Sequence, residues 1–149
     1  PSAPLLKLAH KRAEQKSHMV NYRQAMAEDT RFPDGHFDLA ACTILFHEVP
    51  DDAARHILEE AHRILSPGGL FAIADLLPYP AISPFDGWLV EWQVVHNNEP
   101  FFGDAFARDL PQMATDAGFS NVESKVFGGE RANSSRQRAG LPYLVLATK

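Results

Sequence analysis

The sequence has a single cysteine, no long apolar run and no excess of positive charge. Cys42 has no second cysteine to pair with, which excludes an internal disulfide, and its apolar neighbours favour a small buried side chain over a nucleophile. No apolar run approaches the roughly 20 residues that cross a bilayer, and the N-terminus has no signal-like pattern. The formal net charge of -5 disfavours a polyanion as partner. We therefore expect a cytoplasmic protein that binds a small molecule or a protein surface, with no nucleic acid and no membrane as partner.

The composition is that of an ordinary folded protein. Hydrophobic residues make up 45% of the 149 residues and charged residues 22%, which argues against disorder. A chain of this length can bury roughly 70% of the surface that it exposes when unfolded. We found no internal repeat and no domain linker, so we expect one domain over residues 1–149.

The first half of the chain predicts helices and buried strands in alternation. Residues 3–16 have helical spacing with Pro4 in the first turn, and residues 19–25 alternate as in a short strand. Residues 37–46 are almost continuously apolar, as in a strand that is covered on both faces of a parallel sheet. Asp51 is a good N-cap for the next helix.

That helix is the clearest in the sequence, and a second buried strand follows it. Apolar residues recur at helical spacing up to Leu65, and the run Ser66-Pro67-Gly68-Gly69 should end the helix. Residues 70–76 then read as a buried strand. Strand, helix and strand in this order predict a parallel crossover and an α/β fold.

The second half of the chain predicts an aromatic helix, a short helix and a terminal pair of strands. Phe85, Trp88, Leu89, Trp92 and Val95 form a helical stripe that would suit a lid or a pocket wall. Residues 111–117 predict a helix, and residues 122–126 and 143–147 predict two paired strands. The intervening residues 128–140 suggest a solvated loop more than an anion site.

Two motifs together resemble one protein family. Residues 27–51 read AEDTRFPDGHFDLAACTILFHEVPD, and Leu65-Ser66-Pro67-Gly68-Gly69 follows after a helical segment. This order resembles the class I S-adenosylmethionine-dependent methyltransferases, and the Phe-Pro-Asp-Gly turn and the Pro-Gly-Gly run favour this family over nucleotide-binding dehydrogenases. The resemblance implies a Rossmann-like, mostly parallel sheet of strand order 3-2-1-4-5-7-6 with an antiparallel last strand. It also implies S-adenosylmethionine as cofactor and a small molecule as methyl acceptor.

The family's glycine-rich loop and its strands 1 and 2 have no counterpart in residues 1–149. The resemblance therefore implies a partial methyltransferase domain whose N-terminal strands are missing, and we expect these residues alone to bind S-adenosylmethionine weakly or not at all. Without strand 1, the strand at residues 37–46 has an open edge through which a second copy could pair. The alternative function is a non-catalytic remnant that acts as a dimerisation or interaction module.

The resemblance also implies which residues meet the cofactor. Met26, Ala27 and Glu28 align with the end of the family's strand 3, where an acidic residue usually meets the adenine amino group. Met26 can pack against an adenine face but offers no carboxylate, so that contact would fall to Glu28 or Asp29. Thr43 and Phe46 follow strand 4, beside the methionine part of the cofactor.

Acceptor-side residues come from three places in the sequence. His47 could take a proton from the acceptor, or it could only end the strand together with Glu48. Asp75 stands at the carboxyl end of a strand, where open α/β sheets place ligand-facing groups, or it caps the following turn. Trp88 and Trp92, with His96 nearby, could contact the substrate or belong to the core. No His or carboxylate pair has clean metal-ligand spacing, so we expect no metal site.

Overall fold

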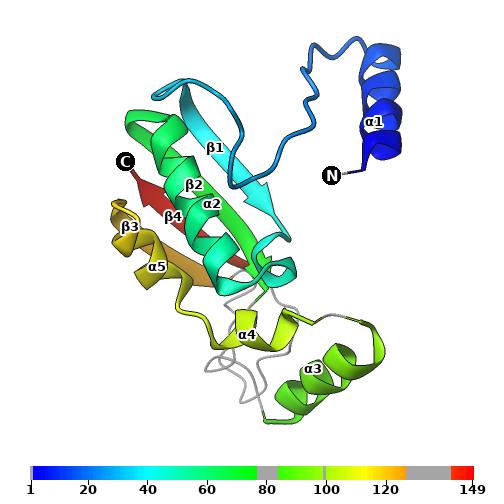
Figure 1. Ribbon diagram of the computed structural model, residues 1–149, viewed down its shortest axis with the longest axis vertical. Coiled ribbons are helices and arrows are strands. Elements are labelled where there is room, and N and C mark those ends of the chain that lie inside the picture. Colours follow the sequence, from blue (N-terminus) through cyan, green and yellow to red (C-terminus); the bar gives the residue numbers. More distant parts are fainter. Residues whose placement is uncertain (1, 77–83, 99, 127–141) are drawn as a thin grey trace.

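A four-stranded mixed sheet forms the centre of the computed structural model, which describes residues 2–76, 84–98, 100–126 and 142–149. The strands are β1 (Phe37–Thr43), β2 (Leu65–Leu76), β3 (Ser120–Val126) and β4 (Pro142–Thr148), in the spatial order β1-β2-β4-β3 (Figure 1). β1 and β2 are parallel, whereas β4 runs antiparallel to both of its neighbours. The expected α/β class and the antiparallel last strand are confirmed, and in the described residues β1 lies at an edge of the sheet. The prediction that this strand is covered on both faces is wrong: no residue of β1 is buried and Leu39 is 59% exposed, because the helices that cover the sheet in Figure 1 lie on one face of it.

Two helices cover one face of this sheet. α2 (Asp51–Ile64) and α5 (Leu110–Asp116) lie in front of the strands in Figure 1. Their apolar side chains join the inward residues of β2 and β4 in one core cluster, because helical spacing on α2 meets alternation on the strands. Each fully buried aliphatic side chain contributes roughly 1.5–3 kcal/mol to this packing. The largest fully buried side chains in the described residues are Leu58, Leu65, Ile73 and Val145.

Gly69 explains why the Pro-Gly-Gly run lies beside β1. A Cβ on Gly69 would stand 2.9 Å from the Ser66 carbonyl oxygen and 3.3 Å from the Asp38 carbonyl oxygen. Only a residue without a side chain lets the start of β2 pass so close to the neighbouring backbone. The ladder between β1 and β2 has its irregularity in this region, between Phe37 and Leu39.

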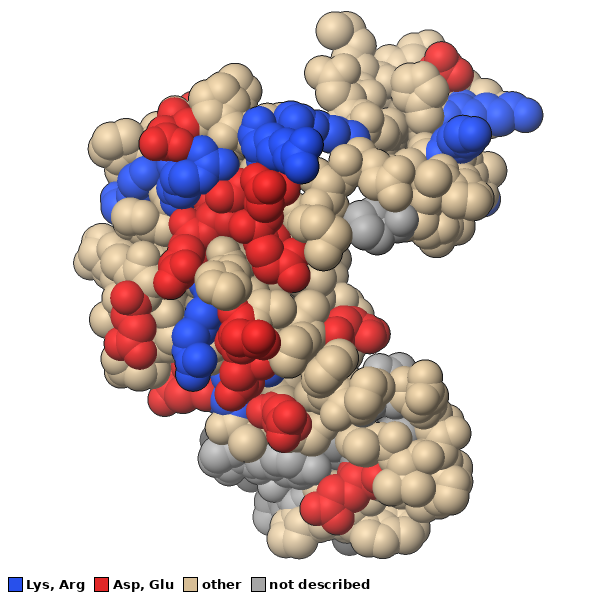
Figure 2. Space-filling model, in the orientation of Figure 1, with Lys and Arg blue, Asp and Glu red and all other residues tan. Residues whose placement is uncertain are grey.

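The remaining helices lie at the periphery. α1 (Ala3–Gln15) stands apart from the sheet at the end of an extended segment (Figure 1). The aromatic α3 (Pro84–His96) and the short α4 (Phe102–Ala107) lie below the sheet in the same view. Figure 2 shows few charged side chains over α3, whereas acidic and basic side chains crowd the surface around α2. None of the helices in the described residues is both long and apolar enough to cross a membrane.

Most of the predicted elements are confirmed to within a few residues. The helices predicted at residues 3–16 and 111–117 correspond to α1 and α5, and the aromatic stripe lies on α3. The two terminal strands pair as expected. The loop predicted at residues 128–140 lies outside the described residues.

The strand predicted at residues 19–25 is wrong, because this segment has no regular structure. A strand forms only where its backbone groups pair with a neighbour. The order implied by the resemblance places this strand beside family strand 2, and no segment of residues 1–149 corresponds to that strand.

Three predicted boundaries also need correction. The strand predicted at residues 37–46 ends at Thr43, because Ile44 adopts a positive φ of 53° and a short 3-10 helix, η1 (Phe46–Glu48), follows. Asp51 is not the N-cap of α2: Pro50 holds that position, without a side-chain cap, and Asp51 binds Arg108 instead. The Ser-Pro-Gly-Gly run does not lie in a loop after the helix, since β2 begins at Leu65 directly after α2.

Candidate functional site

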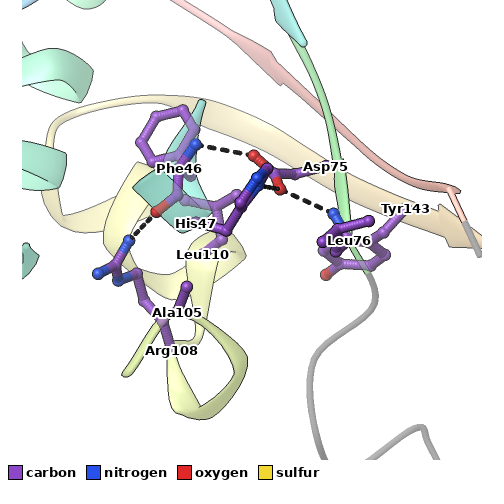
Figure 3. Close-up of a pocket in the computed structure, with 8 residues that line it drawn as sticks. All are labelled: Phe46, His47, Asp75, Leu76, Ala105, Arg108, Leu110 and Tyr143. Atoms are coloured by element: carbon purple, nitrogen blue, oxygen red, sulfur yellow. Dashed lines mark hydrogen bonds and ion pairs between the residues drawn. The ribbon is translucent and has the colours of Figure 1, made fainter. Parts of the chain in front are cut away.

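At the carboxyl end of the parallel strands, Asp75 forms hydrogen bonds with the turn that follows β1. It is the next-to-last residue of β2 and only 5% exposed. One carboxylate oxygen, Oδ2, accepts from the backbone N–H groups of Leu45 (3.1 Å) and Phe46 (2.8 Å). The other, Oδ1, lies 2.7 Å from Nδ1 of His47 and accepts from the N–H of Leu76 at 2.8 Å (Figure 3). Asp75 is thereby a fully bonded buried carboxylate.

His47 is held on three sides. Because the carboxylate of Asp75 only accepts, Nδ1 of His47 is the nitrogen that carries the proton. The other nitrogen, Nε2, lies 3.4 Å from Oε1 of Glu48, and the ring packs edge-on against Phe102 with 5.4 Å between ring centroids. When the ring is neutral, its lone pair therefore lies on Nε2, the position from which a histidine acts as a base; when the ring is protonated, Nε2–H faces the carboxylate of Glu48.

Arg108 fastens the same turn from the other side. Its guanidinium donates to the carbonyl oxygens of Phe46 (2.6 Å) and Val49 (3.0 Å) and, through Nε, to Oδ1 of Asp51 at 2.8 Å. Arg108 follows α4 and is only 8% exposed. It thus joins α4, η1 and the start of α2 through charge-assisted hydrogen bonds.

A small cavity lies between these groups. Its volume is about 20 Å³, which suits about one water molecule and excludes a substrate. The cavity is a packed polar junction rather than a binding pocket. Its walls are formed by Phe46, His47, Asp75, Leu76, Ala105, Arg108, Leu110 and Tyr143 (Figure 3).

A larger hollow lies on the extended segment before β1. Its volume is about 340 Å³, within the range of small-molecule sites, and it is open to solvent on one side. Met26 lines it with a side chain that is 57% exposed. We call this hollow the Met26 groove; its walls are formed by Arg23, Gln24, Ala25, Met26, Asp29 and Arg31.

The buried Glu60 on α2 holds the same segment. Its Oε1 accepts from the backbone N–H of Thr30 (2.8 Å) and from the Thr30 hydroxyl (2.5 Å). Arg63 donates to both carboxylate oxygens at 2.8 Å. The Arg63 guanidinium, and then the two Thr30 donors, lower the pKa of Glu60 from 4.5 to about 2 although burial opposes this shift.

The structure divides the predicted site residues into three places. Phe46, His47 and Asp75 meet at the polar junction, where the Phe46 side chain is buried in the core. Met26 and Thr43 are exposed, the first in the groove and the second at the end of β1, while Ala27 and Glu28 are half-buried and Ala27 packs on the core cluster. The aromatic set lies on α3, with Trp88 56% and Trp92 48% exposed and the ring of Trp92 4.5 Å from that of His96, centroid to centroid.

The sequence reasoning missed Thr30, Glu60 and Arg108. Glu60 had a signal: it lies three residues after Ile57 and four before Ile64 on the buried side of α2, where a charged residue needs a partner. Arg108 had none, because its partners are backbone carbonyls 59 and 62 residues away. In the described ranges, no three or more His, Cys, Asp or Glu side chains are grouped so that they could hold a metal ion.

Comparisons with known proteins agree with this architecture. Residues 1–73 match the family described as a methyltransferase domain. An uncharacterised methyltransferase of Synechocystis sp. is 30% identical over 129 residues, which cover 80% of this chain and 56% of that protein. A demethylmenaquinone methyltransferase of Thermus thermophilus is 32% identical over 77 residues, or 52% of this chain and 34% of that protein. The chain thus spans about half or less of the length of these curated relatives.

A solved structure extends the likeness to the fold. Phosphoethanolamine N-methyltransferase 2 of Haemonchus contortus, solved in complex with S-adenosyl-L-methionine, superposes with a TM-score of 0.67 at 15% identity. The superposition covers 95% of this chain and 40% of that one.

Proposed function

Since this chain carries a methyltransferase domain of the class I S-adenosylmethionine-dependent family, we propose that it takes part in methyl transfer from S-adenosylmethionine to a small-molecule acceptor. The observation that supports this most is the Met26 groove, because it is of ligand size and contains the residue that aligns with the family's adenine-reading position. When bound, the cofactor would supply an electrophilic methyl group on a sulfonium, whose bond to sulfur would break as the acceptor's lone pair forms the new bond. Alignment of the two reactants is then the main task of the protein.

The residues at the groove suit the adenosine end of that cofactor. The exposed Met26 thioether offers a polarisable surface for the face of an adenine ring. Glu28 and Asp29 follow directly, and a carboxylate from either accepts a hydrogen bond from the adenine amino group. Thr43 at the end of β1 would face the methionine part. Phe46 supports the turn beyond it through its backbone, which Asp75 and Arg108 hold.

We assign the acceptor's proton to His47. Because Asp75 holds Nδ1–H, Nε2 is the nitrogen that accepts the proton when the ring is neutral, and Glu48, 3.4 Å away, would stabilise the protonated ring. The ring is nearly buried, so the proton would pass through the one water that the cavity at the junction can hold. In this arrangement Asp75 orients His47 rather than touching the substrate.

The aromatic residues of α3 are the proposed acceptor-side surface. Trp88 and Trp92 present large apolar area in a helix with few charged residues, which suits a planar, apolar acceptor. One relative is named as a demethylmenaquinone methyltransferase. Trp88→Ala and Trp92→Ala should raise the acceptor KM and leave cofactor affinity unchanged.

Titration of the 149-residue chain with S-adenosylhomocysteine, followed by NMR, tests the proposal. We expect perturbed amide signals in residues 23–31 and a Kd on the order of 1 mM, or about 4 kcal/mol of binding free energy, because the family's glycine loop has no counterpart in the chain. Absence of any perturbation at millimolar ligand would refute cofactor binding by these residues. Micromolar affinity would contradict the expected weakness.

The edge of β1 favours a second function, dimerisation or binding of a partner strand. In the described part of the chain β1 has a strand neighbour on one side only, and apolar side chains near its other edge are exposed: Leu39 is 59% exposed and Ile44, just after the strand, is 54% exposed. Sedimentation should then show a dimer that Leu39→Lys converts to a monomer. A wild-type chain that is monomeric at high micromolar concentration would exclude self-pairing.

A further inference from the structure

We infer that Glu60 is a positioning residue which, through Thr30, fixes the shape of the Met26 groove and so sets both the affinity and the base selectivity of cofactor binding. This inference rests on the proposed function. None of the residues that line the groove belongs to α2, yet a residue of this helix would fix the conformation of the groove wall.

Glu60 is a carboxylate in a position where burial is unfavourable. The residue is 7% exposed and lies on the side of α2 whose other residues are apolar. A buried carboxylate is unfavourable unless its oxygens are bonded. Glu60 meets this need with four donors, two from Thr30 and two from Arg63. Thr30 is 30 residues away in sequence, so the pair is a tertiary tie rather than a local one.

The segment that begins at Thr30 is also bonded to α2 at its other end, near the turn before β1. Arg63 also binds Asp34 at 2.5 Å, so one guanidinium bridges Glu60 to the turn before β1. The backbone N–H of Gly35 donates to the Arg63 carbonyl (3.0 Å), and that of His36 to the Ile64 carbonyl (2.7 Å). Residues 30–36 are therefore fastened to the last turns of α2 at both ends.

Thr30 lies beside the Met26 groove without lining it. Its neighbours Asp29 and Arg31 line the groove, while Thr30 itself does not, because its hydroxyl is bonded to Glu60. Arg31 has a positive φ of 57°, a conformation that non-glycine residues adopt at a cost and keep only when their surroundings impose it. The Thr30 tie is the constraint that imposes it, with Phe32 N–H adding a weak bond to the Thr30 hydroxyl at 3.4 Å.

The segment upstream of Thr30 has contacts of its own as well: Ala27 packs against the core, and the Arg23 guanidinium lies 4.7 Å from the centroid of the Phe32 ring. Asp29 N–H donates to the Met26 carbonyl at 3.4 Å, a long hydrogen bond. The Arg31 guanidinium pairs with the Asp29 carboxylate at 3.6 Å, and both side chains are largely exposed. Exposed pairs of this kind contribute little, so among the polar contacts of Met26 through Arg31 the Thr30–Glu60 tie is the one that is withdrawn from solvent.

Thr30→Val is the most direct test, because it removes the hydroxyl with little change in shape. Thr115→Val is its matched control, since the Thr115 hydroxyl bonds only to the Pro111 carbonyl on α5, away from the groove. Thr30→Ser keeps the hydroxyl and serves as the conservative rescue. Glu60→Gln is the companion variant, and its thermal unfolding shows whether it folds.

The measurements are amide hydrogen exchange of residues 26–31 and Kd values for S-adenosylhomocysteine and S-inosylhomocysteine, all on the 149-residue chain. Thr30→Val should speed exchange in this segment at least tenfold and weaken S-adenosylhomocysteine binding about tenfold. It should also reduce the preference for adenine over hypoxanthine, which a general loss of stability would not change. Thr30→Ser should restore all three, and Thr115→Val should change none.

The outcomes separate this inference from the proposed function. If wild type binds neither ligand at millimolar concentration, the proposed cofactor binding by these residues fails and the inference fails with it. If wild type binds but Thr30→Val binds with the same affinity and the same base preference, the inference alone is overturned. Unchanged hydrogen exchange in Thr30→Val would also overturn it, because Thr30 would then not hold the segment.

Discussion

Nδ1 of His47 lies 2.7 Å from Oδ1 of Asp75, and this contact joins the turn after β1 to the end of β2. The two side chains are 7% and 6% exposed, so the pair is withdrawn from bulk water. Asp75 also binds the backbone of Leu45, Phe46 and Leu76. The pair therefore has two effects: it fixes one protonated nitrogen on His47, and it holds together the carboxyl ends of two parallel strands.

Replacing Asp75 by asparagine should destabilise the fold. The amide nitrogen of Asn cannot accept, so at least one buried donor loses its partner, and we expect a loss of about 3 kcal/mol in the free energy of unfolding. Urea denaturation measures the change. Asp116→Asn is the control, because Asp116 accepts only an exposed hydrogen bond from Gln112 and should change stability by less than about 0.5 kcal/mol.

If His47 accepts the proton from the substrate, His47→Gln should lower kcat by roughly 10²–10⁴-fold with little change in cofactor Kd. The measurement is the rate of methyl transfer from S-adenosylmethionine to the acceptor, for wild type and variant in the same catalytically active preparation. Equal kcat values for His47→Gln and wild type would leave His47 only as a support of the turn.

Replacing Arg108 by methionine should loosen the junction between α4 and η1. The variant leaves the carbonyls of Phe46 and Val49 without their donors, at a cost of about 2–4 kcal/mol. Thermal unfolding is the measurement. Arg55→Met on the exposed side of α2 is the matched control, and a similar loss there would show that any arginine has this effect.

Glu60 should make stability depend on pH in the acidic range. Its pKa is lowered from 4.5 to about 2, so the folded state favours the charged form. This contribution is complete above pH 4.5, the unfolded value, and is lost as the pH falls toward 2; its size is on the order of 3 kcal/mol. Unfolding free energies between pH 6 and pH 2.5 should fall more steeply for wild type than for Glu60→Gln. Parallel curves would contradict the prediction.

Cys42 should be almost inert in the folded protein. Burial, with a smaller effect from the nearby Asp75 charge, raises the pKa of its thiol from 9.0 to about 12. The thiolate is the reactive species, so reaction with a disulfide reagent at pH 8 should be about 1,000-fold slower than for a free thiol. The same chain in denaturant should react at the normal rate. Fast labelling of the native chain would place the thiol at the surface.

The sequence by itself predicted the alternation of helices and strands and the resemblance to methyltransferases. Apolar spacing on α2 and the apolar runs of β1 and β2 are local patterns, and a local pattern indicates the type of each element. The aromatic stripe of α3 and the terminal strand pair were predicted for the same reason. The run of β1 did not predict its burial, because no residue of this strand is buried in the structure. The open edge of β1 was expected from the family resemblance, because the family strand that neighbours it has no counterpart in residues 1–149.

Only the tertiary structure decided which residues work together. Residues 19–25 alternate like a strand, yet they have none of the pairing that a strand needs, because pairing depends on a distant neighbour. Thr30 meets Glu60, and Asp75 meets His47, across about 30 residues of intervening chain. A hydrogen bond is decided by distance and angle in space, and no periodicity in the sequence records which buried carboxylate will face which donor.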